Sequence, residues 1–315
     1  MLLYQLNQKI KYGVFLLIKL SKFIKNTAFI AAGVFLLFLI GCKSAPLAVQ
    51  VNPLDLLDDN SSFYMAIPQS VDPELIKRVV QNNVKGISEG NAALLANQVR
   101  KVYCGLNRYK NRTEIQATID ANIPQKYVSK VLNKKNGFTA VPLQTPTSPA
   151  VYTLYSSSQL DLAFPSSKVG CLGRDTKDML CAYDKIFTTA EPDYDGKQYS
   201  PLDTELYDYL MEDANEIRFY ANKPQSFLTI LTGANLDLKL VDVKGAFVCD
   251  PVHDDQYLLN IHFNFKNEKY LKAGRVLLVL AFGLTDSQSW VEGTDQLFIN
   301  GIKIHKEQLY KLLAI

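Results

Sequence analysis

Two stretches of the 315-residue chain, FYMAIPQS at residues 63–70 and FYANKPQS at residues 219–226, are nearly alike. Their shared pattern, FYxxxPQS, recurs after 156 residues. A second echo follows each copy, because KYVSKVL at residues 126–132 resembles KYLKAGRVL at residues 269–277. Two echoes in the same order indicate an internal duplication, so each copy is expected to begin one half of the fold.

The first half predicts the element order β-α-β-β-α-β. A strand over 63–67 ends at Pro68, and Asp72 caps a helix whose first position is Pro73. Residues 114–123 alternate between apolar and polar side chains, which predicts a strand with one face in water. The remaining expected elements are a helix over 91–101, a strand over 102–109, a helix from Pro124, and strands over 151–155 and 159–164.

The second half predicts the same order. Residues 216–221 read as a strand and residues 224–231 as a short helix. Alternation predicts strands from 236 towards 249 and over 257–265, and Asn267 begins a helix. Asn300-Gly301 is a strong turn signal and predicts a hairpin within 296–304, followed by a helical turn over 307–313.

The order β-α-β-β-α-β is that of the split βαβ, or ferredoxin-like, unit. The fold class is therefore expected to be α+β, with two tandem halves of mainly antiparallel strands and helices on one face of each sheet. The two sheets could pair side by side or back to back. The expected boundaries are a signal peptide (1–41), a tether (42–52), a first repeat (53–183), a linker (184–212) and a second repeat (213–315).

The positive charge of the chain belongs to its N-terminus. The whole sequence has 34 basic and 31 acidic residues, a net charge of +3. Residues 1–41 contain no acid and five of the lysines, so the remainder has 29 basic against 31 acidic residues, a net charge of −2. This balance argues against a nucleic acid partner.

The same N-terminal segment resembles the export signal of bacterial lipoproteins. An uncharged run over 28–40 follows the lysines, is short for a spanning helix, and ends in Leu39-Ile40-Gly41-Cys42. The resemblance implies cleavage between Gly41 and Cys42, a diacylglycerol on the Cys42 sulfur, and an acyl chain such as palmitate on the new amino group. A signal anchor that happens to precede a cysteine is the alternative.

The chain as a whole resembles envelope lipoproteins of bacteria, spirochaetal ones among them, in pattern rather than in motif. It is therefore expected in the cell envelope, facing the periplasm or the cell surface, with Cys42 anchored in a membrane. Lys43 after the lipid cysteine leaves the inner and the outer membrane both open.

Four further cysteines occur, at positions 104, 171, 181 and 249. Cys171 and Cys181 bracket a short loop and are the pair that could form a disulfide in an exported chain. Four buried free thiols are the alternative, since a core of this size does not need disulfides.

Candidate metal ligands gather in one place only, Asp250, His253 and Asp255. Asp and Pro in that segment are equally typical of a turn, and the ligand spacing fits no regular site, so no metal and no cofactor is expected. No nucleophile elbow, zinc motif, phosphate loop or dinucleotide fingerprint occurs, and we expect no enzymatic activity.

The sequence thus predicts a lipid-anchored envelope protein that acts as a non-catalytic binding or assembly module at a membrane surface. Its partner would be an unknown envelope protein or an apolar ligand. A periplasmic carrier of a lipid or other apolar ligand is the alternative, and it would need an enclosed apolar pocket of roughly 300 Å³ or more. An enzyme with a dispersed site is a third hypothesis.

Overall fold

The computed structural model describes residues 49–108, 113–173, 175–191, 194–232, 237–282 and 287–313. The signal segment, Gly41, Cys42 and most of the tether lie outside the described residues. Val49–Ile315 forms one compact unit. Within the described residues, no helix has the length and apolar character needed to cross a bilayer.

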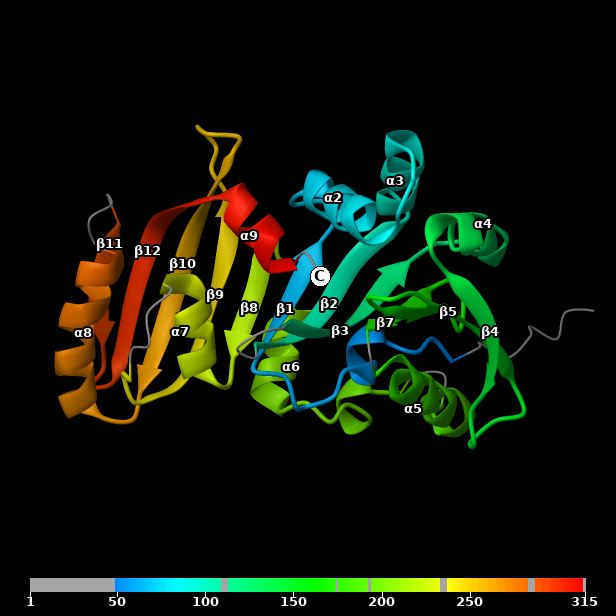
Figure 1. The fold of residues 1–315 in the computed structure, drawn as a ribbon. Helices are drawn as coiled ribbons and strands as arrows, with labels where there is room; N and C mark the ends of the chain where they lie inside the picture. The colour runs from blue at the N-terminus through cyan, green and yellow to red at the C-terminus, as the bar shows by residue number, and fades with distance from the viewer. Residues whose placement is uncertain are drawn as a thin grey trace, which may run out of the picture. The chain divides into compact units, whose positions relative to one another are not determined.

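All strands of the described residues belong to one antiparallel sheet of twelve strands, in the order β11-β12-β10-β9-β8-β1-β2-β3-β7-β6-β5-β4 (Figure 1). The strands are β1 (Phe63–Pro68), β2 (Val99–Arg108), β3 (Thr113–Ala121), β4 (Thr139–Gln144), β5 (Val151–Ser156), β6 (Asp161–Ala163), β7 (Val169–Gly173), β8 (Ile217–Ala221), β9 (Leu240–Cys249), β10 (Gln256–Phe265), β11 (Gln288–Glu292) and β12 (Gln296–His305).

Helices cover this sheet on both faces. They are α2 (Pro73–Asn83), α3 (Glu89–Ala96), α4 (Gln125–Val131), α5 (Thr176–Thr189), α6 (Thr204–Met211), α7 (Pro224–Thr232), α8 (Glu268–Phe282) and α9 (Lys306–Leu313), with short 3-10 turns η1 (Pro53–Leu56), η2 (Lys134–Asn136) and η3 (Gly196–Gln198). Asp72 caps α2 as predicted, because its Oδ1 accepts a hydrogen bond from the Leu75 amide at 3.1 Å.

The two copies of FYxxxPQS meet at the centre of the sheet. β1 pairs with β8 in antiparallel register, with Tyr64 opposite Tyr220 and Met65 opposite Phe219. The halves therefore lie side by side. Outward from this pair, the order β1-β2-β3-β7 on one side matches β8-β9-β10-β12 on the other. The matching order fits the duplication, which stays a prediction.

The α+β class is confirmed, but the split βαβ arrangement is not what the structure has. In that arrangement a third strand lies between two parallel strands, whereas β1 and β2 are direct antiparallel neighbours. The reason is the path of α2 and α3, which return the chain to the end of β1. There the Gln69 amide donates to the Arg100 carbonyl at 2.9 Å, so β2 starts beside the residue where β1 stopped.

The prediction of helices on one face only was wrong. Phe63 and Met65 pack in the same cluster as Phe227 of α7, whereas Tyr64 and Ala66 point to the other face and pack with α6. Figure 1 shows α5 and α6 away from the layer that contains α2, α3, α4, α7, α8 and α9.

The polar face of the strand over 114–123 is consequently buried in its middle, and only its ends, at Glu114, Asp120 and Asn122, reach solvent. Gln116 and Thr118, on its polar side, are 4% and 0% exposed. The Gln116 Oε1 accepts from the Asp58 amide at 2.9 Å, next to η1, whereas the buried Thr118 Oγ1 has no hydrogen-bond partner among the described residues. On β10, by contrast, alternation gave the correct result, with residues 257, 259, 261, 263 and 265 buried and those between them half-buried.

The hairpin predicted at Asn300-Gly301 was also wrong, because β12 runs straight through these residues. Gly301 has φ +79° and its amide donates to the Asn260 side chain at 3.0 Å. Pairing between β10 and β12 shifts register here, between Leu259 and Ile261. Asn-Gly thus supplies the left-handed residue of a bulge rather than a turn.

The described residues of the segment expected as a linker, 184–212, lie largely in regular elements. It contains the end of α5, η3 and the whole of α6. Leu206 and Leu210 of α6 are buried against the sheet together with Tyr207. The segment therefore packs over its own unit.

Candidate functional site

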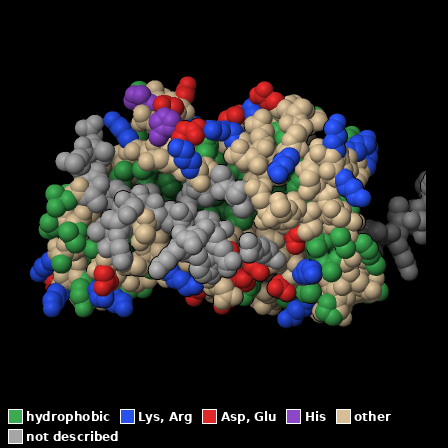
Figure 2. Space-filling model, viewed as in Figure 1, with side chains coloured by type: hydrophobic (Ala, Val, Ile, Leu, Met, Phe, Trp, Pro, Cys, Tyr) green, Lys and Arg blue, Asp and Glu red, His purple; other side chains and the backbone are tan. Residues whose placement is uncertain are grey.

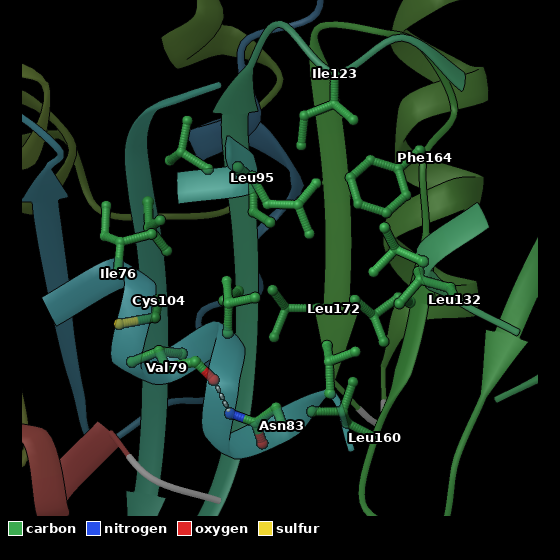
Figure 3. Close-up of a pocket in the computed structure, with 18 of the residues that line it drawn as sticks. Ile76, Val79, Asn83, Leu95, Cys104, Ile123, Leu132, Leu160, Phe164 and Leu172 are labelled. Atoms are coloured by element: carbon green, nitrogen blue, oxygen red, sulfur yellow. Dashed lines mark hydrogen bonds between the residues drawn. The ribbon is translucent and has the colours of Figure 1, made fainter. Parts of the chain in front are cut away.

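The main feature of the first half is an apolar cavity of about 150 Å³. It lies between α2, α3 and α4 on one side and β1, β2, β3, β6 and β7 on the other. Figure 3 shows side chains from the helices and from the strands pointing towards each other across this space. We call this space the apolar cavity.

The sequence pattern of α2 and β3 produces the apolar lining. Leu75, Ile76, Val79 and Val80 lie on one face of α2, as the helical spacing predicts, and all four line the cavity. The apolar positions of β3, from Ile115 to Ile119, face them from the sheet. The helix layer over this part of the sheet is made of short helices of 11, 8 and 7 residues, and it leaves space unfilled.

Asn83, the last residue of α2, is the one polar side chain in the cavity lining. Its Nδ2 donates to the Val79 carbonyl at 2.8 Å, which fixes the orientation of the amide. Its Oδ1 is buried and has no hydrogen-bond partner among the described residues. A buried acceptor without a partner costs about 1–3 kcal/mol in the free energy of folding.

The C-terminal helix closes one side of the cavity with Leu313. α9 is held to α2 by Asp72, whose carboxylate lies 3.3 Å from the Lys306 Nζ and accepts from the Tyr310 hydroxyl at 3.3 Å. Arg78 of α2 pairs with Glu307, and its guanidinium lies 4.1 Å from the centre of the Tyr310 ring. The Arg78 guanidinium lowers the pKa of Glu307, and burial raises the pKa of Tyr310 to about 12.

A polar cluster fixes the end of the tether on the opposite face of the sheet. Asp55 is 1% exposed and accepts hydrogen bonds from Tyr207 at 2.8 Å and Tyr194 at 3.1 Å. Asn52 joins it, because its amide donates to the Tyr194 hydroxyl at 2.7 Å and its side chain to Tyr207 at 3.0 Å. Burial raises the pKa of Asp55 to about 6, despite these hydrogen bonds.

The candidate metal ligands are found in two separate pairs. His253 Nδ1 lies 3.1 Å from Asp250, whereas Asp255 lies 3.1 Å from His305 of β12. Across the described residues, no three histidine, cysteine or carboxylate side chains converge on one point that could hold a metal ion.

The disulfide considered between Cys171 and Cys181 is not formed. Cys171 lies in β7 and Cys181 in α5, and both are free thiols, as are Cys104 and Cys249. Burial raises the pKa of Cys104 and Cys171 to about 12, so these two thiols are protonated.

Sequence reasoning identified the apolar face of α2, and the carrier hypothesis required a pocket between sheet and helices, but the sequence did not locate the cavity beneath α2. A cavity is a shortfall of volume between elements, and no residue pattern carries that information. The sequence held one weak indication of Asn83, since a polar residue follows Val79 one helical turn later, in line with the apolar face of α2.

Comparison with known proteins gives one family. Residues 48–310 match the family model described as outer membrane-associated lipoprotein TP0453. A search of curated proteins gave no match.

Solved structures of TP0453 share the fold. Crystal form I has a TM-score of 0.61 at 17% identity, covering 84% of this chain and 97% of that one. Crystal form III has a TM-score of 0.60 at 17% identity (84% and 98% coverage), and form IV a TM-score of 0.58 at 16% identity (84% and 98% coverage). With the family model matching most of its length, the chain belongs to the family of the outer membrane-associated lipoprotein TP0453, and it is an envelope lipoprotein.

Proposed function

We propose that residues 49–315 act as a non-catalytic binding module at the membrane, and that the module holds an apolar chain in the apolar cavity. The observation that carries this proposal is the lining itself. All side chains around the cavity are apolar except Asn83. A cavity of this kind stays dry and favours an apolar occupant, because water there would find almost no hydrogen-bond partner.

The volume limits what the cavity can hold. At about 150 Å³ it is half of the roughly 300 Å³ set as the minimum for a carrier that encloses its ligand. An engineered cavity of about this size in another protein binds benzene. The cavity therefore suits the end of an acyl chain, and a lipid bound there would keep its head outside.

The absence of catalysis is part of the same proposal. The polar groups that fasten α9 to α2, at Asp72, Tyr310 and Lys306, are engaged with one another. This arrangement supports a structural role for them.

Displacement of a fluorescent apolar dye, N-phenyl-1-naphthylamine, tests the binding. The protein is the mature chain from residue 42 with Cys42→Ala, so that no lipid of its own competes. The dye should brighten on binding and be displaced by 1-dodecanol. Ala117→Leu, which places three more carbons in the cavity wall, should abolish this signal, and Ala117→Val should weaken it. Ala273→Leu on the exposed side of α8 is the control. Unchanged dye binding in both Ala117 variants would contradict the proposal.

We further propose that Cys42 carries the lipid anchor, as the match of Leu39-Ile40-Gly41-Cys42 to a lipobox implies. Cys42→Ala should abolish incorporation of labelled palmitate and release the chain from membranes. Cys181→Ala, which changes another cysteine, should do neither. Continued labelling of the Cys42→Ala protein would contradict this assignment.

A further inference from the structure

We propose that the ligand of the apolar cavity is a single-chain anionic amphiphile, whose charged head lies on a group of five lysines at the edge of the cavity. These are Lys85, Lys126, Lys130, Lys134 and Lys135, here called the lysine rim. This inference rests on the proposed function, because it names the chemistry of the ligand that the cavity would hold.

The charge distribution supplies the first argument. The chain without its signal has a net charge of −2, yet residues 121–160 contain four lysines and no acidic residue. All five lysines of the rim are exposed, and no carboxylate of the described residues forms an ion pair with them. Figure 2 shows blue side chains gathered over α4. A local field of this sign attracts an anion.

The position of these lysines supplies the second argument. Each lies within three residues of a side chain that lines the cavity: Lys85 follows Val84, Lys126 and Lys130 flank Val128, and Lys134 and Lys135 follow Leu132 at spacings of two and three.

The lysine rim combines residues that follow α2 with residues of α4 and η2, and these two parts of the chain lie close together. A β-carbon added at Gly137, after η2, would lie 3.8 Å from Cδ of Lys85, which follows α2. On α4, the Lys126 and Lys130 amines lie 5.3 and 5.6 Å from the centre of the Tyr127 ring, which is 47% exposed. A head group there would meet ammonium groups from both helices.

The cavity and the rim together define an amphiphile. The cavity volume of about 150 Å³ allows one chain end rather than two whole chains. The carboxylate of a fatty acid and the phosphate of a single-chain phospholipid both provide the anion, and the test separates them.

The test is calorimetric titration of the mature chain carrying Cys42→Ala, with twelve-carbon ligands kept below their micelle concentrations. The ligands share one twelve-carbon chain and differ in the charge of the head group. They are two anions (dodecanoate and dodecyl phosphate), a neutral alcohol (1-dodecanol) and a cation (dodecyltrimethylammonium). At least one anion should bind about tenfold or more tightly than the alcohol, and the cation should bind more weakly than the alcohol. The preferred anion identifies a fatty acid or a phosphate lipid as the source.

Two variants separate chain from head. In the first variant, Gln replaces Lys126, Lys130, Lys134 and Lys135. This change should weaken binding of the anion about tenfold and leave binding of the alcohol unchanged. The control makes the same change of net charge elsewhere, with Gln at Lys168, Lys177, Lys185 and Lys197. It should leave the affinities for the anion and the alcohol unchanged. Ala117→Leu should weaken anion and alcohol alike.

The outcomes that overturn the inference are distinct from those that overturn the proposed function. If alcohol and anions bind equally, or if the rim variant does not change anion binding, the inference of an anionic head group is wrong while the proposed function of the cavity stands. Failure of every ligand to bind removes both. Anion binding, or adsorption to dioleoylphosphatidylglycerol vesicles, could depend on the lysine rim and yet be unaffected by Ala117→Leu. That result would show that the lysine rim contacts a membrane surface and not the head group of a ligand in the cavity.

Discussion

At the scale of single residues, Asn83 and Asp55 are polar side chains placed inside the protein. Asn83 presents a buried oxygen with no partner among the described residues to an apolar cavity. Asp55 is a carboxylate buried beneath the sheet among two tyrosines. Each placement carries a cost in the free energy of folding, and for Asp55 the hydrogen bonds from Tyr207 and Tyr194 offset part of it.

Asn83→Leu should raise the free energy of unfolding by about 1 kcal/mol, because it removes an unsatisfied buried acceptor and extends the apolar lining. The Val79 carbonyl loses the hydrogen bond from the Asn83 side chain but remains part of the helix backbone. Urea unfolding measures the change, and Asn82→Leu, at the exposed neighbouring position, should be neutral within about 0.5 kcal/mol. A clearly less stable Asn83→Leu protein would mean that its oxygen has a partner.

Asp55 predicts a pH dependence of stability. Its pKa of about 6 in the folded protein lies above the ordinary value of 3.8, so the folded state binds the proton more tightly than the unfolded one. The free energy of unfolding should therefore rise as the pH falls from about 7 to about 4, by up to about 3 kcal/mol from this group.

Asp55→Asn should remove this contribution, and Asp195→Asn, the exposed carboxylate nearby, should leave most of it. Stability measured by urea at several pH values makes the comparison. A profile for Asp55→Asn that matches that of the unmodified chain would show that the proton binds elsewhere.

At the scale of elements, strong alternation and caps were predictable, and exceptions came from tertiary contacts. The cap at Asp72 and the strand at β10 follow from local sequence and are present. The buried middle of the polar face of β3 and the elements α5 and α6 were not predictable, because residues from other parts of the chain, such as Asp58 after η1, contact Gln116 there.

Gly301 gives a prediction at this scale. Its φ of +79° lies in the left-handed region, with no atom within 4 Å of an added β-carbon, so Gly301→Ala tests the backbone alone. It should lower the free energy of unfolding by about 1 kcal/mol. Gly90→Ala in α3, with equal space around it, should raise it by about 0.5–1 kcal/mol. Thermal unfolding of both variants should show shifts of opposite sign; equal shifts would contradict the bulge.

At the scale of the whole molecule, one continuous sheet joins the halves through β1 and β8. One core cluster draws buried side chains from β1, β2 and β3 as well as from β8, β9, β10 and β12. The repeat FYxxxPQS predicted that two halves exist, but the pairing of its own strands needed the structure, since a sequence repeat does not say which edge of each copy is free.

This shared core predicts a single unfolding transition. Trp290, the only tryptophan, lies in β11 of the second half and reports on it by fluorescence, whereas far-ultraviolet circular dichroism reports on both halves. The two signals should change at the same urea concentration. Two separated transitions would show that the halves fold independently.

The central claim is that an apolar chain occupies the space between α2, α3, α4 and the sheet. Its most direct test is photo-crosslinking with dodecanoate that carries a diazirine at the end of its chain, followed by mass spectrometry of the labelled peptides. We expect labels on cavity side chains such as Leu160, Leu162 and Leu172, and we expect these labels to be lost in Ala117→Leu. Labels confined to exposed apolar residues such as Val276 and Leu280 of α8, and unaffected by Ala117→Leu, would contradict it.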